Sequence, residues 1–197
     1  MFAFKKYYYL AEKYFSDEFC DRIIDHAENS EYDKRDRQFG YRDSEVIFIP
    51  PNLETKWLYD PLYEVVEQAR SKCWRTIKID HLQAVQYTIY NAPGGKYNWH
   101  SDMCIGSRGT ERRILSMVVQ LADTDTYTGG EFEISECAEM DTNDVSYGQI
   151  PDPEDVKTLR PPRGSVIIFP SFLSHRVLPV TKGTRKSLVG WCDGRFI

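Results

Sequence analysis

The sequence predicts a single α+β domain in which two N-terminal helices support an antiparallel β sandwich or barrel. Three observations lead to this fold class. The chain has 197 residues, of which 41% are hydrophobic, so it can bury one substantial core but is short for two. Helical periodicity is confined to about residues 1–75. From about 76 to 197, short runs rich in Val, Ile, Tyr, Phe and Thr are separated by turn residues, as in all-β cores.

The two helices are predicted from their capping residues and apolar faces. In residues 16–29, Ser16 can cap the helix, and the two acidic residues after it suit the positive N-terminal end. A second helix is expected to begin near Asp60 and Pro61, because Asp can cap and proline fits the first helical position. Each helix has one hydrophobic side, formed by Phe19, Cys20, Ile23, Ile24 and Ala27 in the first and by Leu62, Val65, Val66, Ala69 and Cys73 in the second.

The β core is predicted from hydrophobic runs bounded by Gly, Pro, Asn and Asp. The regular spacing of these runs favours antiparallel pairing, with the helices packed outside one sheet. The expected strands are 83–90, 96–102, 113–121, 130–134, 164–169, 175–180 and 186–192.

Two segments interrupt the pattern and are expected to be loops. Residues 30–41 are crowded with charge, which is typical of a solvated surface loop and sometimes of a functional one. From Glu131 to Val156 there are nine acidic residues and no Lys or Arg. We therefore expect 135–160 to be a solvent-facing insertion that repels phosphate backbones.

Composition limits the partners and the compartment. The formal net charge of -5 does not favour nucleic acid, which needs a clustered basic surface. The N-terminus lacks a secretion signal, and no apolar stretch is long enough to span a bilayer, so no membrane partner is expected. We expect a cytoplasmic protein, in the host cytoplasm if the chain is phage-encoded. The five cysteines are scattered and suit free thiols: Cys20, Cys73, Cys104, Cys137 and Cys192.

A candidate metal site lies in the segment Tyr97–Asp102. Side chains alternate along a strand, so His100 and Asp102 point to the same face. The pair alone is weak evidence, since 30 of the 197 residues are acidic. Two imidazoles and one carboxylate on one face of an iron(II) ion leave other coordination positions open for small ligands. His175, after an apolar strand, is the best third ligand, because His26 lies on a predicted helix and His81 resembles a surface or packing histidine.

A candidate carboxylate-binding site follows ten residues after His175. Arg185 and Ser187 share one face of a predicted strand, so a planar guanidinium and a hydroxyl lie side by side, which suits a carboxylate. Lys186 is then expected to point outward. An arginine at a hairpin is by itself more often a surface residue, and its distance from His175 is what favours the functional interpretation.

Taken together, these motifs resemble the prolyl 4-hydroxylase-like branch of the 2-oxoglutarate and iron(II) oxygenase superfamily, including its small bacterial and phage members. The resemblance covers about residues 80–193. It rests on the ordered motifs Tyr90–Tyr97, His100–Asp102, Gly129–Phe132, Pro162–Pro170 and His175–Arg185.

The resemblance implies a double-stranded β-helix, or jelly-roll, with the metal at its open end. His100, Asp102 and His175 would bind Fe(II), and Arg185 would bind the distal carboxylate of 2-oxoglutarate. Tyr90 would line the same pocket and Ser187 would assist Arg185. The implied cofactors are Fe(II), 2-oxoglutarate and dioxygen, with ascorbate as an optional reductant. Tyr87, Trp99 and Trp191 are candidates for packing near the site, although core packing is the more common role of such residues.

The implied activity is hydroxylation of a prolyl residue in a peptide or protein. Asp102 favours hydroxylation over halogenation, because halogenating relatives carry a small residue there. The open alternatives are another amino acid or a small metabolite as substrate, a non-catalytic β-barrel that binds a ligand or protein, and a structural assembly factor. Nucleic-acid demethylation fits worse, because Arg195 lies too far from Arg185 to supply the second arginine of that group.

Overall fold

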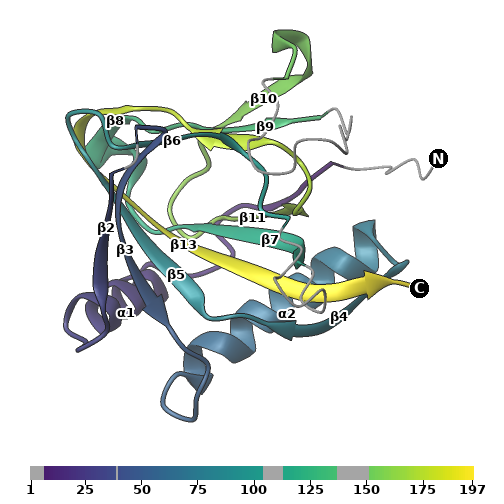
Figure 1. Cartoon of the computed structure of the whole chain (residues 1–197). Helices are drawn as coiled ribbons and strands as arrows, with labels where there is room; N and C mark the ends of the chain where they lie inside the picture. The colour runs from purple at the N-terminus through teal and green to yellow at the C-terminus, as the bar shows by residue number, and fades with distance from the viewer. Residues whose placement is uncertain (1–6, 39, 104–112, 137–150) are drawn as a thin grey trace.

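A computed structural model describes residues 7–38, 40–103, 113–136 and 151–197 (Figure 1). It contains two α-helices, two short 3-10 helices and a curled antiparallel sheet. The helices are α1 (Asp17–Glu28), α2 (Lys56–Cys73), η1 (Thr124–Thr126) and η2 (Pro153–Asp155). The strands are β1 (Tyr9–Ala11), β2 (Lys34–Gln38), β3 (Arg42–Ile49), β4 (Ile77–Leu82), β5 (Val85–Asn91), β6 (Lys96–His100), β7 (Arg113–Gln120), β8 (Tyr127–Gly129), β9 (Phe132–Ser135), β10 (Val156–Leu159), β11 (Val166–Pro170), β12 (His175–Val177) and β13 (Val180–Phe196).

Helix α1 forms where the sequence predicts it. Ser16 is the N-cap, and its side chain accepts a hydrogen bond from the Phe19 backbone N–H. The side chains of Cys20, Ile23 and Ala27 are buried on the inner face. Capping and periodicity therefore suffice to place this helix.

Helix α2 begins five residues before its predicted start. The turn before it is built by Asn52, whose side-chain oxygen accepts hydrogen bonds from the backbone N–H groups of Glu54 and Thr55. Leu58 in the first turn is fully buried. Pro61 thus lies inside the helix and removes one backbone hydrogen bond. Packing of the first turn against the core accounts for the difference, because tertiary contacts can outweigh a proline.

The strands form one sheet that curls until its two ends face each other. Its order is β1-β11-β7-β13-β5-β3-β6-β12-β9-β10, with β2 on β3 and with β4 and β8 on β13. Strand β3 is where the sheet turns, because its first residues pair with β6 and its later residues pair with β5. Figure 1 shows α1 and α2 covering the outer face of the larger half, with β6, β9 and β10 lying across from it. The expected α+β class, with helices outside one sheet, is confirmed.

The segment before residue 76 differs from the expected helical support, because it also contributes three strands. Strand β1 extends the sheet beside β11. The expected loop 30–41 is wrong in part: Lys34–Gln38 forms β2, which pairs along β3. Charged residues are tolerated in β2 because β3 is its only partner among the described strands, which places β2 at the sheet margin. The single-domain organisation stays a prediction.

The expected insertion 135–160 is also partly strand. Residues Val156–Leu159 form β10 and pair with β9 in antiparallel register. Residues 137–150, which make up most of the insertion, lie outside the described part of the chain. Of the five cysteines, Cys20, Cys73 and Cys192 form no disulfide with one another, while Cys104 and Cys137 lie outside the described residues.

Two hydrophobic clusters occupy the two faces of the larger half of the sheet. One packs α1 and α2 against residues such as Tyr87, Leu115 and Leu188. The other lies inside the curl and includes Tyr90, Val118 and Phe169. Because alternate residues of one strand point to opposite faces, strands such as β7 and β11 supply both clusters. Among the described residues, no helix is both long and apolar enough to cross a membrane.

Candidate metal centre and adjoining cavity

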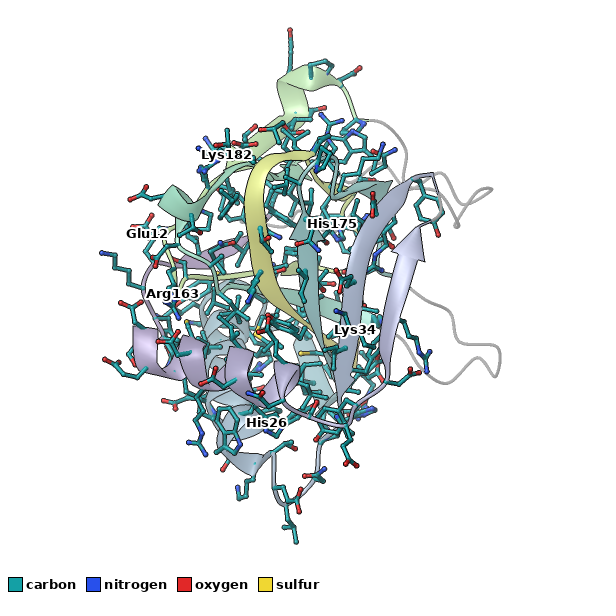
Figure 2. All side chains as sticks on the ribbon, turned by 90° about the vertical axis from the view of Figure 1, so that its left-hand side faces the viewer. Glu12, His26, Lys34, Arg163, His175 and Lys182 are labelled. Carbon is teal, nitrogen blue, oxygen red and sulfur yellow. The ribbon has the colours of Figure 1, made fainter. Side chains whose placement is uncertain are left out.

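The three predicted metal ligands meet at the open end of the curled sheet. Strands β6 and β12 pair so that His175 lies directly opposite His100, with ring centroids 4.2 Å apart. The Asp102 carboxylate lies between them, 3.8 Å from the Nε2 atom of His100 and 3.4 Å from that of His175. The three ligand atoms all lie within 4.8 Å of one another. Figure 2 shows His175 within the body of the molecule, whereas His26 lies on the helical layer.

Asp102 reaches the site from beyond the strand that was expected to carry it. The predicted strand 96–102 ends at His100. The backbone N–H of Asp102 instead donates to the carbonyl of Ser171, at 2.9 Å. Strand alternation thus predicted the right face, but a long-range backbone hydrogen bond fixes the position of the carboxylate.

Backbone carbonyls orient both imidazoles. The Nδ1 atom of His100 lies 2.8 Å from the carbonyl of Asn98, and that of His175 lies 2.9 Å from the carbonyl of Leu173. A carbonyl can only accept, so Nδ1 carries the proton in each ring. The Nε2 atoms therefore face Asp102, where they can bind a metal, as in many metal sites with oriented histidines.

The charge states also suit a metal. Burial lowers the pKa of His100 to about 3, with a further contribution from His175, and the nearby carboxylate only partly opposes this. Burial by itself would raise the pKa of Asp102, but the combined interactions with His175, His100 and Ser116 outweigh burial and lower it. At neutral pH the site therefore presents a neutral His100 ring and a carboxylate, which are suitable ligands for iron(II).

Two serines hold the carboxylate in place, and the sequence analysis did not identify them. Ser116 Oγ on β7 donates to Asp102 Oδ2 at 2.8 Å and lies 2.9 Å from Ser171 Oγ. Both serine side chains are buried. The only sequence signal was their position near predicted strands, which does not distinguish them from other polar residues of a β core.

A cavity of about 210 Å³ adjoins the three ligands. This volume is below the roughly 300–1,000 Å³ typical of pockets for drug-sized ligands, so the cavity suits a small molecule or one part of a larger one. Its lining combines His100, Asp102 and His175 with Arg42, Phe48, Gln86, Tyr90, Tyr97, Arg113, Val118, Phe132, Val177, Arg185, Ser187, Val189 and Trp191.

The predicted carboxylate-binding residues lie together on the wall of this cavity. Arg185 is 3% exposed, and its Nη1 atom donates to Ser187 Oγ at 3.2 Å. Its guanidinium carbon lies 5.5 Å from the centroid of the Tyr90 ring on β5. Burial raises the pKa of the Tyr90 hydroxyl despite the two nearby arginines, so this hydroxyl stays protonated and can donate.

The glycine pair at 129–130 makes room for Arg185. Gly130 has a φ of +69°, and a Cβ atom there would lie 3.0 Å from Arg185 Cδ and 2.9 Å from Val180 Cγ2. A larger residue would be strained in the backbone and would press on the arginine. The glycine motif therefore supports the cavity as well as forming a turn.

At another part of the cavity lining, Arg113 is held by a chain of polar contacts. Its Nε atom donates to Gln83 Oε1 at 3.0 Å, and Gln83 Nε2 donates to Asp193 Oδ1 at 2.8 Å. The Arg113 guanidinium lies 4.0 Å from the centroid of the Trp191 ring. Sequence patterns could not reveal this arrangement, because its members lie far apart in the chain.

Some expectations about neighbouring side chains need correction. Trp191 lines the cavity, but Tyr87 faces the helices, where its hydroxyl donates to Glu28 Oε1 at 2.6 Å. Trp99 lies under the Arg176 guanidinium, outside the cavity lining. Lys186 points away from the cavity but is not free in solvent, because its Nζ atom lies 2.7 Å from Glu28 Oε1.

The two rejected histidines lie away from the metal centre. His81 has a side chain that is 60% exposed and lies 3.0 Å from Asp193 Oδ2, as suits a surface residue. His26 is half-buried on α1, with its ring near those of Tyr32 and Trp57. Neither belongs to the group of three close ligand atoms found among the described residues.

Comparisons with known proteins agree with this geometry. The sequence profile of the 2OG-Fe(II) oxygenase superfamily matches residues 83–193. A PKHD-type hydroxylase of Synechococcus sp. strain CC9605 is 34% identical over 103 residues, covering 52% of this chain and 39% of that protein. A PKHD-type hydroxylase of Synechococcus elongatus is 33% identical over 141 residues, covering 70% of this chain and 56% of that protein. The chain thus spans less than two thirds of the length of these relatives.

Solved structures confirm the expected fold. A Pseudomonas putida prolyl-4-hydroxylase superimposes with a TM-score of 0.69 at 18% identity, covering 97% of this chain and 94% of the other. A viral collagen prolyl hydroxylase from Paramecium Bursaria Chlorella virus-1, solved with 2OG, gives 0.69 at 20% identity and covers 97% of both chains. The fold is thus the double-stranded β-helix of these enzymes. With the profile match across its β core, the chain belongs to the 2OG-Fe(II) oxygenase superfamily.

Proposed function

We propose that this protein is an Fe(II)- and 2-oxoglutarate-dependent dioxygenase that hydroxylates a prolyl residue in a peptide or protein. One observation carries the proposal. Arg185 is a buried cation with no ion pair to any acidic residue in the described part of the chain, and it lines the same cavity as His100, Asp102 and His175. A buried guanidinium without a counter-ion is costly, so an anionic ligand is needed beside the metal.

The three ligands would hold the iron through two imidazole nitrogens and one carboxylate. This donor set on one side of an iron ion is typical of oxygenases that leave positions open for small molecules. The carbonyls of Asn98 and Leu173 keep both Nε2 atoms turned inward, and Ser116 restrains the carboxylate. When bound, iron(II) with 2-oxoglutarate and dioxygen supplies an oxidant that hydroxylates an unactivated C–H bond and leaves succinate and carbon dioxide.

Arg185 would bind the carboxylate of 2-oxoglutarate that lies away from the metal. Its planar guanidinium can donate two hydrogen bonds to one carboxylate, and Ser187 and Tyr90 can add a hydroxyl each. Holding the far end of the co-substrate fixes its orientation, because a bound geometry close to the reactive one lowers the barrier. The buried walls also exclude water from the reacting groups.

A prolyl substrate is supported by the names of similar proteins and by the cavity. One structural neighbour is a prolyl hydroxylase from Trichoplax adhaerens in complex with a peptide fragment, with a TM-score of 0.68 at 14% identity. Phe48 and Trp191 line the cavity together with His175. Aromatic side chains provide apolar surface on which a pyrrolidine ring can pack.

Other substrates of the same chemistry are another amino acid or a small metabolite, which the modest cavity volume also suits. A non-catalytic binding module would not require oriented imidazoles together with a buried, unpaired arginine.

A reducing compartment such as the cytoplasm would keep the iron as Fe(II) and the thiols free. We also propose ascorbate as an optional reductant that supports turnover. Turnover assays with and without ascorbate test this role.

The decisive test is stabilisation by metal and co-substrate together. At a hundred times its dissociation constant, a ligand stabilises a protein by about 2.7 kcal/mol, or roughly 5–10 °C for a chain of this size. We expect Mn(II) and 2-oxoglutarate to raise the melting temperature, with little effect of 2-oxoglutarate in the absence of metal. Oxygen consumption with Fe(II) and a prolyl peptide panel, followed by mass spectrometry for one added oxygen, then tests turnover.

Arg185→Ala separates the co-substrate site from the metal site. Loss of charge-assisted hydrogen bonds worth about 1.5–3 kcal/mol should raise the 2-oxoglutarate requirement roughly 10–100-fold. Mn(II) affinity should stay within about twofold, and Arg185→Lys should recover part of the loss. An Arg185→Ala protein with an unchanged 2-oxoglutarate requirement would show that the co-substrate lies elsewhere.

A further inference from the structure

A second arginine of the cavity, Arg42 at the start of β3, lacks an anionic partner. Its Nε atom donates to Ser44 Oγ at 2.8 Å, but its Nη2 atom is buried and has no hydrogen-bond acceptor among the described residues. The guanidinium carbon lies 4.4 Å from the centroid of the Tyr97 ring. The Tyr97 ring also stacks with that of His100, a proposed metal ligand, with ring centroids 3.5 Å apart. Arg42 is therefore close to the metal centre without touching it.

The charges of the cavity leave Arg42 uncompensated. Three arginines line it, Arg42, Arg113 and Arg185, but Asp102 is the only acidic residue of the lining. Iron(II) and 2-oxoglutarate carry opposite charges of two, and Asp102 and Arg185 carry opposite charges of one, so these four groups balance. No described acidic residue forms an ion pair with Arg42. When the proposed site is full, Arg42 and Arg113 each keep a positive charge that pairs with no acidic residue in the described part of the chain.

Arg113 and Arg42 differ in how their donors are satisfied. The Arg113 guanidinium is tied to Gln83 and packs on Trp191. Arg42 has one bond to a neutral hydroxyl and one buried nitrogen without an acceptor. A half-buried guanidinium in this state is stabilised by an arriving carboxylate, which supplies both the acceptor and the opposite charge.

We propose that Arg42 binds a carboxylate of the primary substrate, so that the enzyme selects an acidic substrate. This inference rests on the proposed function, in which both carboxylates of 2-oxoglutarate are already assigned, one to the metal and one to Arg185. The anion at Arg42 must then come from another molecule. That carboxylate is either the free chain terminus of the hydroxylated residue or an acidic side chain next to it.

Matched pairs of small probes test the inference on the whole protein. The protein is loaded with Mn(II) and 2-oxoglutarate, and binding near the metal is followed by the relaxation of probe protons. N-acetylproline against N-acetylprolinamide tests a terminal carboxylate. N-acetyl-prolyl-glutamate amide against the corresponding glutamine compound tests an acidic side chain. We expect the acidic member of at least one pair to bind about tenfold more tightly, because a charged hydrogen bond contributes this much.

Variants of Arg42 test whether a preference for the acidic probes depends on this residue. Arg42→Gln should reduce the acid-to-amide ratio to within about twofold of one, while the dissociation constant of 2-oxoglutarate stays within about twofold of the original. Arg42→Lys should keep part of the preference, because the charge remains. Arg195→Gln removes the same charge from an exposed ion pair with Asp80 and should leave the ratio unchanged.

Two results would overturn the inference. The first is equal affinity for both members of every pair, including failure of every acidic probe to bind. The second is a loss of 2-oxoglutarate affinity in Arg42→Gln as large as that in Arg185→Ala, which would make Arg42 a co-substrate residue. Failure of the proposed function itself would be distinct, because the unaltered protein would then show no stabilisation by metal and 2-oxoglutarate.

Discussion

The two faces of strand β13 differ in function, although their residues alternate along one strand. One face lines the cavity, and the other packs against the helices. Arg185 and Ser187 point into the cavity, where buried polar groups remain available to ligands. Lys186 and Leu188 point to the helical layer, where Lys186 pairs with Glu28 and Leu188 is fully buried. The cavity face holds a cation without a described ion-pair partner, whereas on the helical face Lys186 is paired and Leu188 is buried. The fold thus separates binding chemistry from stability by the period of a strand.

Strand β7 shows the same division. Leu115, Met117 and Val119 pack against the helices and are fully buried. Ser116 faces the other way and hydrogen-bonds to Asp102. Substitutions on the cavity face should therefore alter ligand binding, and substitutions on the helical face should alter unfolding.

Asp102→Ala should have the largest effect on the cavity face. Loss of a charged ligand should reduce Mn(II) affinity by at least the 10–100-fold that loss of a supporting residue typically costs, and should abolish substrate-coupled succinate formation. Titration of the apo-protein with Mn(II) and a succinate assay measure this. Asp102→Asn keeps the shape and serves as the control for packing. Normal turnover in Asp102→Ala would remove this carboxylate from the site.

Leu188→Ala should have the largest effect on the helical face. Truncation of a buried leucine costs about 2–5 kcal/mol of unfolding free energy, because it removes apolar contacts and leaves a cavity. Urea denaturation measures this, and the 2-oxoglutarate affinity of the folded variant should stay within about twofold. If co-substrate affinity falls while stability is unchanged, the two faces are not independent.

Ser116→Ala should have an intermediate effect on metal affinity. The Asp102 carboxylate would lose the hydroxyl that orients it, which should weaken Mn(II) binding about 10–100-fold. Ser116→Thr keeps a hydroxyl and should restore most of the affinity. A purely structural role predicts instead a lower melting temperature with normal metal affinity in the folded fraction.

On the helical face, Glu28→Gln should have the smallest effect of these substitutions. It should change only how the free energy of unfolding depends on pH. Burial raises the pKa of Glu28, but the hydrogen bonds from Lys186 and Tyr87 together with the charges of Lys186 and Lys34 lower it more, so the folded-state pKa lies below the unfolded value. Its stabilisation is therefore present above the ordinary glutamate pKa of about 4.3 and is lost as pH falls through the lower folded value. The side chain is 39% exposed, so we expect less than about 1 kcal/mol.

Denaturation of the original protein and of Glu28→Gln across pH 3–7 measures this contribution. The difference between the two should shrink toward the acid end. A difference that grows as pH falls would have the wrong sign for a carboxylate stabilised in its charged form.

Local patterns in the sequence predicted the parts of the fold that are governed by local interactions. Helix α1 appeared with its expected cap, and the expected β7 and β11 lie within two residues of their predicted ends. The start of α2 and the strand β2 were missed for one reason. In both, contacts with distant segments outweigh a local signal, the proline in α2 and the charge of β2.

The chain order of motifs also predicted the residues of the candidate site. His100, Asp102, His175 and Arg185 could be selected because each type has a specific chemistry and a fixed spacing. Ser116 and Arg42 could not, since a serine or an arginine in a strand is common and its role depends on what lies across the fold.

The sequence by itself determined the fold class, the types of the candidate ligands and the faces from which they project, because residue type and strand alternation are local properties. Only the tertiary structure decided which carbonyls orient the imidazoles, which serine restrains the carboxylate, and which arginines remain without a counter-ion. These depend on sheet curvature and on pairings between residues far apart in the chain, such as Ser116 with Asp102. The energy of a buried polar group is set by its neighbours in space, and local sequence does not specify them.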